Sequence, residues 1–187
     1  MMGLYEKHIL PKCLNFAMKA PAMANLREQL VPLAEGNVLE VGIGSGLNLP
    51  FYRDDVNVTG VDPSPELQVY ARHIAKKRGM KVAFLTQGGE SLPINDNTFD
   101  SVVMTWTLCT IPKPDLALAE IKRVLKPGGK IIFAEHGEAP DEEVRKWQNR
   151  IDPIWQMIAG GCHLNRRIET LYNCEGFAFD QIEKGYI

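Results

Sequence analysis

Short apolar runs, rich in β-branched residues, alternate along the chain with segments of helical periodicity. Each run is nearly continuous in apolar residues, as strands are when helices cover both faces of their sheet. The alternation predicts an α/β sandwich of three layers, with a mostly parallel, twisted sheet between helices. The strand candidates are Val38–Val41, Val56–Val61, Val82–Leu85, Ser101–Met104, Lys130–Ala134 and, more weakly, Phe179–Ile187.

Two helices are predicted between these strands. Pro65–Arg78 follows Ser64, a favourable N-cap residue, and ends in basic residues before Gly79, as helix C-termini do. Asp115–Lys126 has an apolar face and is expected to end at Pro127-Gly128-Gly129. Both helices are expected to pack on the sheet.

Further helical segments flank this core. Residues from about Tyr5 to Leu33 read as helical, with breaks at Pro11 and Pro21. Residues 1–36 therefore form an N-terminal helical cap, which either lies over the open edge of the sheet or packs on its face for stability alone.

Helical periodicity returns over Asp141–Cys174, with interruptions predicted at Pro153 and around Gly160-Gly161. We expect substrate-side helices at about residues 140–175. The length of 187 residues suits one domain over residues 1–187, with residues 37–187 as the cofactor-binding core.

The charge balance excludes several classes of partner. Lys and Arg number 21 against 23 for Asp and Glu, so no net positive field attracts nucleic acid. The longest stretch without a charged residue is thirteen residues long, whereas a bilayer span needs about 20 apolar residues. We therefore expect no nucleic-acid partner and no integral membrane segment.

Glu6 and Lys7 precede any apolar core, so no secretory signal is expected and the predicted location is cytoplasmic. The four cysteines are widely scattered, without a C-x-x-C pair, so free thiols and no metal site are expected.

A glycine-rich turn carries the clearest chemical signal. The strand Val38–Val41 runs directly into Gly42-Ile43-Gly44-Ser45-Gly46, where backbone can approach a ligand without obstruction by Cβ atoms. A dinucleotide fingerprint would need its third glycine at position 47, which is Leu47. The spacing therefore favours a ligand without phosphates.

An acidic residue supports the same interpretation. Asp62 ends the second strand, 20 residues after Gly42, where a carboxylate can accept hydrogen bonds from both hydroxyls of a ribose. The alternative is a local turn or capping role before Pro63-Ser64-Pro65. Together, the strand, the glycines and the acid predict a nucleoside ligand.

The chain resembles the class I S-adenosylmethionine-dependent methyltransferases of the type 11 group, which have a Rossmann-like fold. The likeness spans Val38 to about Phe133. It rests on V-L-E-V-G-I-G-S-G, G-V-D-P-S at the ribose position, Gly89-Glu90-Ser91-Leu92-Pro93, Phe99-Asp100, and E-I-K-R-V-L-K-P-G-G-K from Glu120 to Lys130.

The resemblance implies S-adenosylmethionine as cofactor and S-adenosylhomocysteine as product. It places Glu40 and the glycine turn at the amino-acid end of the cofactor, Asp62 at the ribose and Glu90 near the adenine. Many relatives carry an acid where this chain has Gly88, so backbone groups or Glu90 are expected to replace it. The implied cofactor-binding residues are Glu40, Gly42, Ile43, Gly44, Gly46, Asp62, Pro63, Gly89, Glu90, Ser91 and Thr105.

Features outside this core resemble small bacterial relatives of the methyltransferase-like seven thiol methyltransferases. They are W-T-L-C-T-I from Trp106, Ala134-Glu135-His136, D-P-I-W from Asp152 and G-C-H-L-N-R from Gly161. The resemblance implies a small-molecule methyl acceptor, with a thiol as the favoured candidate.

Methyl transfer from a sulfonium needs mainly an acceptor placed in line with the methyl group. His136 follows the fifth strand and is the candidate catalytic base, with Glu135 beside it either orienting the imidazole or anchoring a loop. The alternative is that His136 only hydrogen-bonds the carbonyl of a loop residue. The candidate substrate pocket comprises Trp106, Cys109, Trp155 and His163, with Cys162 in the same glycine-interrupted region.

Two other functions stay open. One is methylation of a quinone-like or other apolar ring, which needs a wide apolar pocket. The other is a catalytically silent protein that binds S-adenosylmethionine as a sensor or partner subunit. Finally, the family's sheet has seven strands, whereas this chain stops near the sixth, so the final strand is expected to be absent. An exposed sheet edge at the sixth strand would then favour self-association.

Overall fold

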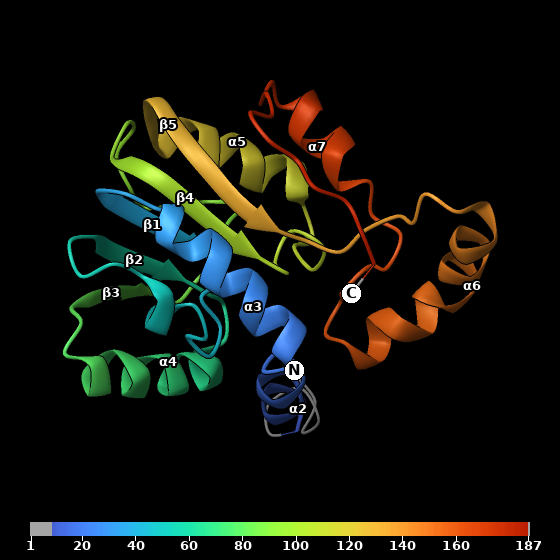
Figure 1. Cartoon of the computed structure of the whole chain (residues 1–187), viewed down its shortest axis with the longest axis horizontal. Coiled ribbons are helices and arrows are strands. Elements are labelled where there is room, and N and C mark those ends of the chain that lie inside the picture. Colours follow the sequence, from blue (N-terminus) through green and yellow to red (C-terminus); the bar gives the residue numbers. More distant parts are fainter. Residues whose placement is uncertain (1–8, 187) are drawn as a thin grey trace.

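The computed structural model describes residues 9–186 and contains a five-stranded parallel sheet. The strands lie side by side in the order β3-β2-β1-β4-β5, so β2 and β3 lie on one side of β1 and β4 and β5 on the other. All of their pairings are parallel (Figure 1). Their bounds are β1 Asn37–Val41, β2 Asn57–Val61, β3 Val82–Leu85, β4 Phe99–Thr105 and β5 Leu125–Ala134.

Helices cover both faces of this sheet. Figure 1 shows α3 crossing one face, with α5 and α7 on the other. The helical elements are α2 Leu10–Ala17, α3 Pro21–Leu30, η1 Val31–Leu33, η2 Leu49–Phe51, α4 Pro65–Arg78, α5 Pro114–Val124, α6 Glu142–Ile158 and α7 Ile168–Cys174. The three-layer α/β architecture expected from the sequence is thus confirmed.

Alternating strand residues feed two separate cores. On one face, Leu39 and Met104 pack with Leu118 of α5 and Tyr172 of α7. On the other, the neighbouring strand positions pack with η1 and α4. Because successive side chains of a strand point to opposite faces, a sheet covered on both sides must be apolar at nearly every position. The continuous apolar runs of the sequence are the consequence.

The helix α4 has the boundaries that its sequence predicts. The Ser64 hydroxyl accepts a hydrogen bond from the Leu67 backbone N–H, and Pro65 occupies the first turn. Gly79 ends the helix in the left-handed region, at φ 71°. A residue with a Cβ is strained in that conformation, so glycine is the favoured choice there.

Not every predicted helix boundary was correct. The helix predicted over Asp115–Lys126 ends at Val124, because Leu125 already pairs with Phe99 as the start of β5. The break predicted at Pro21 is confirmed, because α2 ends at Ala17 and α3 begins at Pro21, whereas Pro11 lies in the first turn of α2, where proline is tolerated. The part of this segment before Ile9 lies outside the described residues.

Pro153 was expected to interrupt a helix, yet α6 continues through it. The Asp152 carboxylate accepts a hydrogen bond from the Gln156 amide one turn later, which holds the helix together across the proline. The break predicted at Gly160-Gly161 is confirmed, and both glycines have positive φ.

The sixth strand expected over Phe179–Ile187 does not form within residues 179–186; Ile187 lies outside the described residues. Phe179 packs on aromatic neighbours instead. The Phe179 ring centroid lies 6.0 Å from those of both Phe133 and Tyr172. Within the described residues, β5 therefore forms the edge of the sheet that was expected at the sixth strand.

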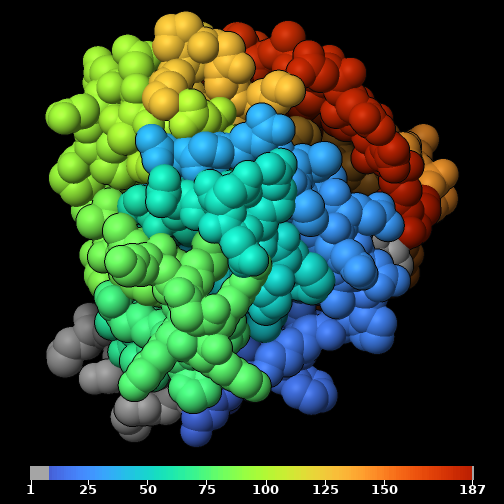
Figure 2. Space-filling view, turned by 60° about the vertical axis from the view of Figure 1, so that its left-hand side comes forward, coloured from blue at the N-terminus to red at the C-terminus, as the bar shows by residue number. Residues whose placement is uncertain are grey.

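The N-terminal helices pack on a sheet face and against the segment that follows β1. Val31 and Ala34 are buried with Val38 and Val103 in one core. The Arg27 guanidinium donates hydrogen bonds to Asn48 and to the Met18 carbonyl. In the space-filling view, this blue segment lies beside the cyan segment after β1 (Figure 2).

Replacement of Leu118 by alanine tests the core beneath the site. Leu118 is fully buried, so Leu118→Ala should lower the free energy of unfolding by about 2–5 kcal/mol. The matched control is Leu116→Ala on the same helix, where the side chain is 44% exposed and a change within about 0.5 kcal/mol is expected. Urea denaturation followed by circular dichroism measures both, and equal losses would contradict the packing.

Candidate functional site

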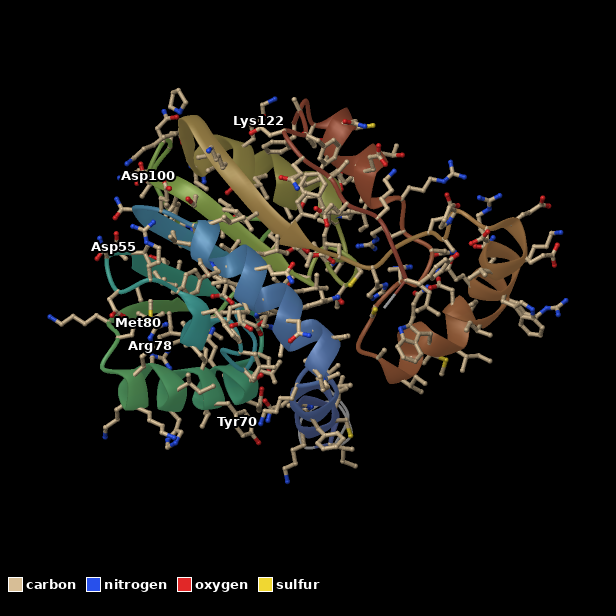
Figure 3. The ribbon with its side chains drawn as sticks, viewed as in Figure 1. Asp55, Tyr70, Arg78, Met80, Asp100 and Lys122 are labelled. Atoms are coloured by element: carbon tan, nitrogen blue, oxygen red, sulfur yellow. The ribbon has the colours of Figure 1, made fainter. Side chains whose placement is uncertain are left out.

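The carboxyl ends of the parallel strands all lie along one border of the sheet, called its carboxyl edge, which faces α2 and α6 in Figure 1. Ligands of open α/β sheets bind at this edge, where the strand order reverses. The opposite edge holds the beginnings of the strands, marked in Figure 3 by Asp100 at the start of β4. There the Asp100 carboxylate accepts hydrogen bonds from Lys126 and the Asn37 backbone. The following residues all lie at the carboxyl edge or just beneath it.

The glycine turn after β1 is fixed by the neighbouring strand and helix. The Gly42 and Ile43 N–H groups both donate to the Val61 carbonyl, at 2.8 and 3.0 Å. A Cβ on Gly42 would overlap the Thr107 side chain, and a Cβ on Gly46 would lie 2.7 Å from the Ala71 Cα. These two glycines are therefore required for packing inside the protein.

Gly44 lies in a different environment. Its φ is 49°, yet an added Cβ would meet nothing nearer than 3.8 Å, where the Asp62 carboxylate lies. The middle of the turn is thus open beside an acid. This is the arrangement that lets a ligand approach the backbone closely.

Asp62 performs the turn role that the sequence left as the alternative to ribose binding. Its Oδ2 accepts a hydrogen bond from the Gly44 N–H at 2.9 Å, and its Oδ1 accepts one from the Ser64 N–H at 2.8 Å. Burial raises the pKa of this carboxyl, while both backbone bonds favour its ionised form. Each oxygen of the carboxylate keeps a further lone pair, so the turn contacts leave capacity for two ribose hydroxyls.

Glu40 lies beneath the turn rather than open to the ligand side. The side chain is 1% exposed, and its oxygens accept hydrogen bonds from Asn48 and from the Tyr52 hydroxyl, each at 2.9 Å. Burial raises the pKa of Glu40 to about 8. The carboxyl therefore braces the turn through Asn48 and Tyr52, two residues that the sequence analysis did not single out.

Asn48 connects this carboxyl to the end of β4. Its Nδ2 also donates to the Thr105 hydroxyl at 3.0 Å, and its Oδ1 accepts from Arg27. The Arg27 guanidinium carbon lies 4.7 Å from the centre of the Trp106 ring, a cation–π contact. Trp106 has a φ of 52°, which is strained for a bulky residue and is most often found at functional sites.

The segment after β3 places Glu90 where a side chain at position 88 would lie. A Cβ on Gly88 would overlap the Glu90 carboxylate. A Cβ on Gly89 would lie 3.0 Å from Val41, so this glycine lies close to the end of β1. The Ser91 carbonyl accepts a hydrogen bond from Gln87, which closes the turn. The Glu90 carboxylate thus fills the space beside Gly88 that a side chain at position 88 would enter.

The turn after β4 is held by a buried carboxylate and a guanidinium. Glu135 accepts hydrogen bonds from the backbone N–H groups of Thr107, Leu108 and Cys109, at 2.8, 2.7 and 3.3 Å. Arg166 donates to the carbonyls of Leu108 and Ile111. Burial raises the pKa of Glu135 to about 7. Of the two roles considered for Glu135, loop anchoring is the one its hydrogen bonds perform.

His136 lies against a thiol, not against a loop carbonyl. Its Nε2 is 2.9 Å from the Cys162 sulfur, which lies 3.8 Å from the Cys109 sulfur. The hydrogen bond with Cys109 and the adjacent imidazole lower the pKa of Cys162. The bond to Cys162 in turn raises the pKa of His136.

Two more residues of the expected acceptor pocket converge on these thiols. The Trp155 side chain contributes to lowering the pKa of Cys162. The His163 N–H donates to the Cys109 carbonyl at 2.9 Å, and its ring lies 3.4 Å from the Asp152 carboxylate. Trp106 is instead engaged by Arg27. Cys162 therefore lies at the centre of this group of side chains. The sequence alone had placed Cys162 only in the glycine-interrupted region that follows α6.

Comparison with known proteins places this geometry in a family. Residues 39–133 match the methyltransferase domain model. Thiol S-methyltransferase TMT1A of Homo sapiens is 35% identical over 173 residues, which cover 90% of this chain and 70% of that protein. Thiol S-methyltransferase TMT1B of Rattus norvegicus is 36% identical over 153 residues, and these cover 80% of this chain but only 62% of the relative.

The fold agrees with solved structures. The YcgJ protein of Bacillus subtilis superimposes with a TM-score of 0.70 at 22% identity, over 85% of this chain and 70% of that one. The fold, the domain match over β1 to β5 and the relatives lead to one conclusion. The chain belongs to the methyltransferase domain family, the class I methyltransferases that use S-adenosylmethionine as methyl donor.

Proposed function

We propose that this protein transfers the methyl group of S-adenosylmethionine to the sulfur of a small thiol. The observation that carries the proposal is the joining of two half-sites at one sheet edge. The glycine turn, with its open Gly44 beside Asp62, contacts Thr107, and the turn from Thr107 leads to the thiols and His136. The identity with two thiol S-methyltransferases supports sulfur as the acceptor atom.

In this proposal the cofactor lies across the ends of β1, β2 and β4. Asp62 and the adjoining Pro63 hold the ribose, while Gly89, Glu90 and Ser91 lie at the adenine. The glycine turn approaches the amino-acid end, braced from below by Glu40 and linked through Asn48 to Thr105. The cofactor, when bound, supplies a methyl group on a positively charged sulfur.

The acceptor side is proposed to consist of His136 with Trp106, Cys109, Trp155 and His163. This chain's part in the reaction is mainly positional: an activated methyl needs an acceptor held in line on its far side. The turn that carries Cys109 is fixed by Glu135 and Arg166, so acceptor-facing groups on it are held rigidly. Rigid placement of this kind supports in-line displacement.

Location and partners complete the proposal. None of the helices between residues 9 and 186 has the length and apolar character needed to cross a bilayer. We propose a cytoplasmic location, which the four free thiols support. We further propose self-association along the exposed edge of β5, because an unpaired strand edge can pair with a second chain.

A set of matched acceptors tests the proposed reaction. Incubation with S-adenosylmethionine and small thiols should yield the S-methyl thioethers, detected by mass spectrometry. Alcohols and amines of equal size, a phenol and a reduced quinone are the comparison acceptors. Methylation of the quinone with none of the thiols would overturn the choice of sulfur. Tight cofactor binding without product from any acceptor would favour the catalytically silent alternative.

Replacement of Asp62 tests the ribose site. Asp62→Ala should weaken S-adenosylmethionine binding ~100-fold or more, because two charge-assisted hydrogen bonds from the ribose hydroxyls would be lost and such bonds contribute about 1.5–3 kcal/mol each. Asp55→Ala is the control, since Asp55 is exposed and pairs with Arg53. Isothermal titration calorimetry measures both affinities. Near-normal affinity of Asp62→Ala would remove Asp62 from the ribose site.

A compensating pair tests Glu90. Glu90→Ala should weaken cofactor binding by roughly tenfold, as expected for a lost hydrogen bond to a charged group. Addition of Gly88→Asp to that variant should restore most of the affinity, because the new carboxylate enters the space that Glu90 vacates. Rescue by the double variant separates adenine recognition from a general loss of structure. Unchanged affinity of Glu90→Ala would contradict the assignment.

A further inference from the structure

Three soft ligand groups from distant parts of the sequence meet at the acceptor end of the site. Cys109 lies in the turn after β4, His136 follows β5, and Cys162 follows α6. Their ligand atoms all lie within 4.8 Å of one another. Their spacing along the chain predicted no metal site, because the three segments become neighbours only through folding.

We propose that Cys109, His136 and Cys162 form a binding site for a zinc ion. Two thiolates and an imidazole are ligands that Zn²⁺ prefers. Tetrahedral zinc with Zn–S bonds of about 2.3 Å separates two sulfurs by about 3.8 Å. The Cys109 and Cys162 sulfurs are 3.8 Å apart, so they already have this separation.

The imidazole must withdraw from the Cys162 sulfur to share an ion with it and with Cys109, whose sulfur lies within 4.8 Å of a ring nitrogen. Its Nε2 hydrogen-bonds the Cys162 sulfur at 2.9 Å, whereas nitrogen and sulfur sharing a zinc ion lie about 3.5 Å apart. A withdrawal of about 0.6 Å is within the reach of side-chain rotation. Zinc would replace the proton between these atoms, and its two charges would balance the two thiolates.

The protein holds two of these ligands in place through their backbones. Glu135 accepts a hydrogen bond from the Cys109 N–H, and the Cys109 carbonyl accepts one from the His163 N–H. The second bond ties the residue after Cys162 directly to Cys109. These backbone bonds therefore fix the approach of the two thiols without using either sulfur, and the sulfurs hydrogen-bond to each other and to the His136 imidazole and the Thr110 hydroxyl.

The three ligands leave one tetrahedral position of the zinc ion for a group from outside the cluster. Sites of this kind are catalytic, since structural zinc sites are closed by four protein ligands. Because a coordinating thiol loses its proton to become a thiolate, a small thiol acceptor in this position would be ionised at neutral pH. This step rests on the proposed function, and it identifies the substrate as a thiol able to reach a buried metal.

The balanced step is a displacement at carbon. The acceptor thiol releases its proton to solvent on binding the metal. Its sulfur then forms a bond to the methyl carbon while the bond from that carbon to the cofactor sulfur breaks. The electron pair goes to the cofactor sulfur, giving neutral S-adenosylhomocysteine and a thioether, and the thioether leaves because it is a weaker zinc ligand than a thiolate.

Metal binding by the full chain tests the site without any methyl transfer. The protein is loaded with Zn²⁺ or Co²⁺ under a phosphine reductant, which keeps the thiols reduced and does not itself supply one. After dialysis, close to one zinc ion per chain is expected by elemental analysis. The cobalt form should give the visible bands of tetrahedral Co²⁺ with sulfur-to-metal charge transfer.

Single replacements assign the ligands. Cys109→Ser, Cys162→Ser and His136→Gln should each weaken zinc affinity by more than about tenfold. Cys13→Ser and Cys174→Ser are matched controls, because both thiols are exposed and lie outside the cluster, and they should bind as the parent does. Circular dichroism and cofactor binding verify that each variant is folded. A parent protein without stoichiometric metal, or folded ligand variants that bind normally, would overturn the proposal.

The open position has its own test. Addition of 2-mercaptoethanol to the cobalt form, without S-adenosylmethionine, should intensify the charge-transfer band, while ethylene glycol should not. No response to the thiol would overturn the substrate step. Methylated product from the metal-free protein would overturn the role of zinc and leave the proposed function standing. A normal cobalt spectrum without any methylated thiol would overturn the proposed function and leave the metal site standing.

Discussion

The parallel pairing of β1 with both β2 and β4 is the constraint on which the rest of the structure depends. It brings the ends of three strands to one edge, and each of these ends carries a different part of the site. The glycine turn follows β1, Asp62 follows β2, and Thr105 ends β4. A shift of register by one residue would turn every inward side chain outward, so the two apolar cores also define where these groups meet.

Three buried carboxyls perform three different tasks at this edge. Glu40 braces the turn from below, Asp62 holds the turn and faces the ligand side, and Glu135 collects the backbone N–H groups of the turn before Ile111. Burial raises the pKa of all three, and hydrogen bonds received from the protein oppose that shift. Buried carboxyls are tolerated here because every oxygen has a donor.

The two halves of the proposed site are built differently. The cofactor half is assembled from short, contiguous segments, each attached to the end of its own strand. The acceptor half needs α6 and the chain after it to return to the sheet, where His163 and Arg166 bond the turn after β4. Methyltransferases of one family use the same methyl donor but different acceptors. Variation in a separately attached segment can therefore change the acceptor without disturbing the cofactor site.

The sequence by itself determined the layers, the five strands, the boundaries of α4, the glycine turn and Asp62. These features are local, because apolar runs, helix caps and glycine spacing act over a few residues. Their effect on structure can therefore be predicted from each segment by itself. Tertiary structure decided the end of α5, because Leu125 pairs with Phe99 as the start of β5. It likewise decided the aromatic packing of the segment after α7 and the position of the Glu90 carboxylate beside Gly88. It also decided the meeting of Cys109, His136 and Cys162, because those residues are 27 and 26 positions apart and only the long-range return of the chain makes them neighbours.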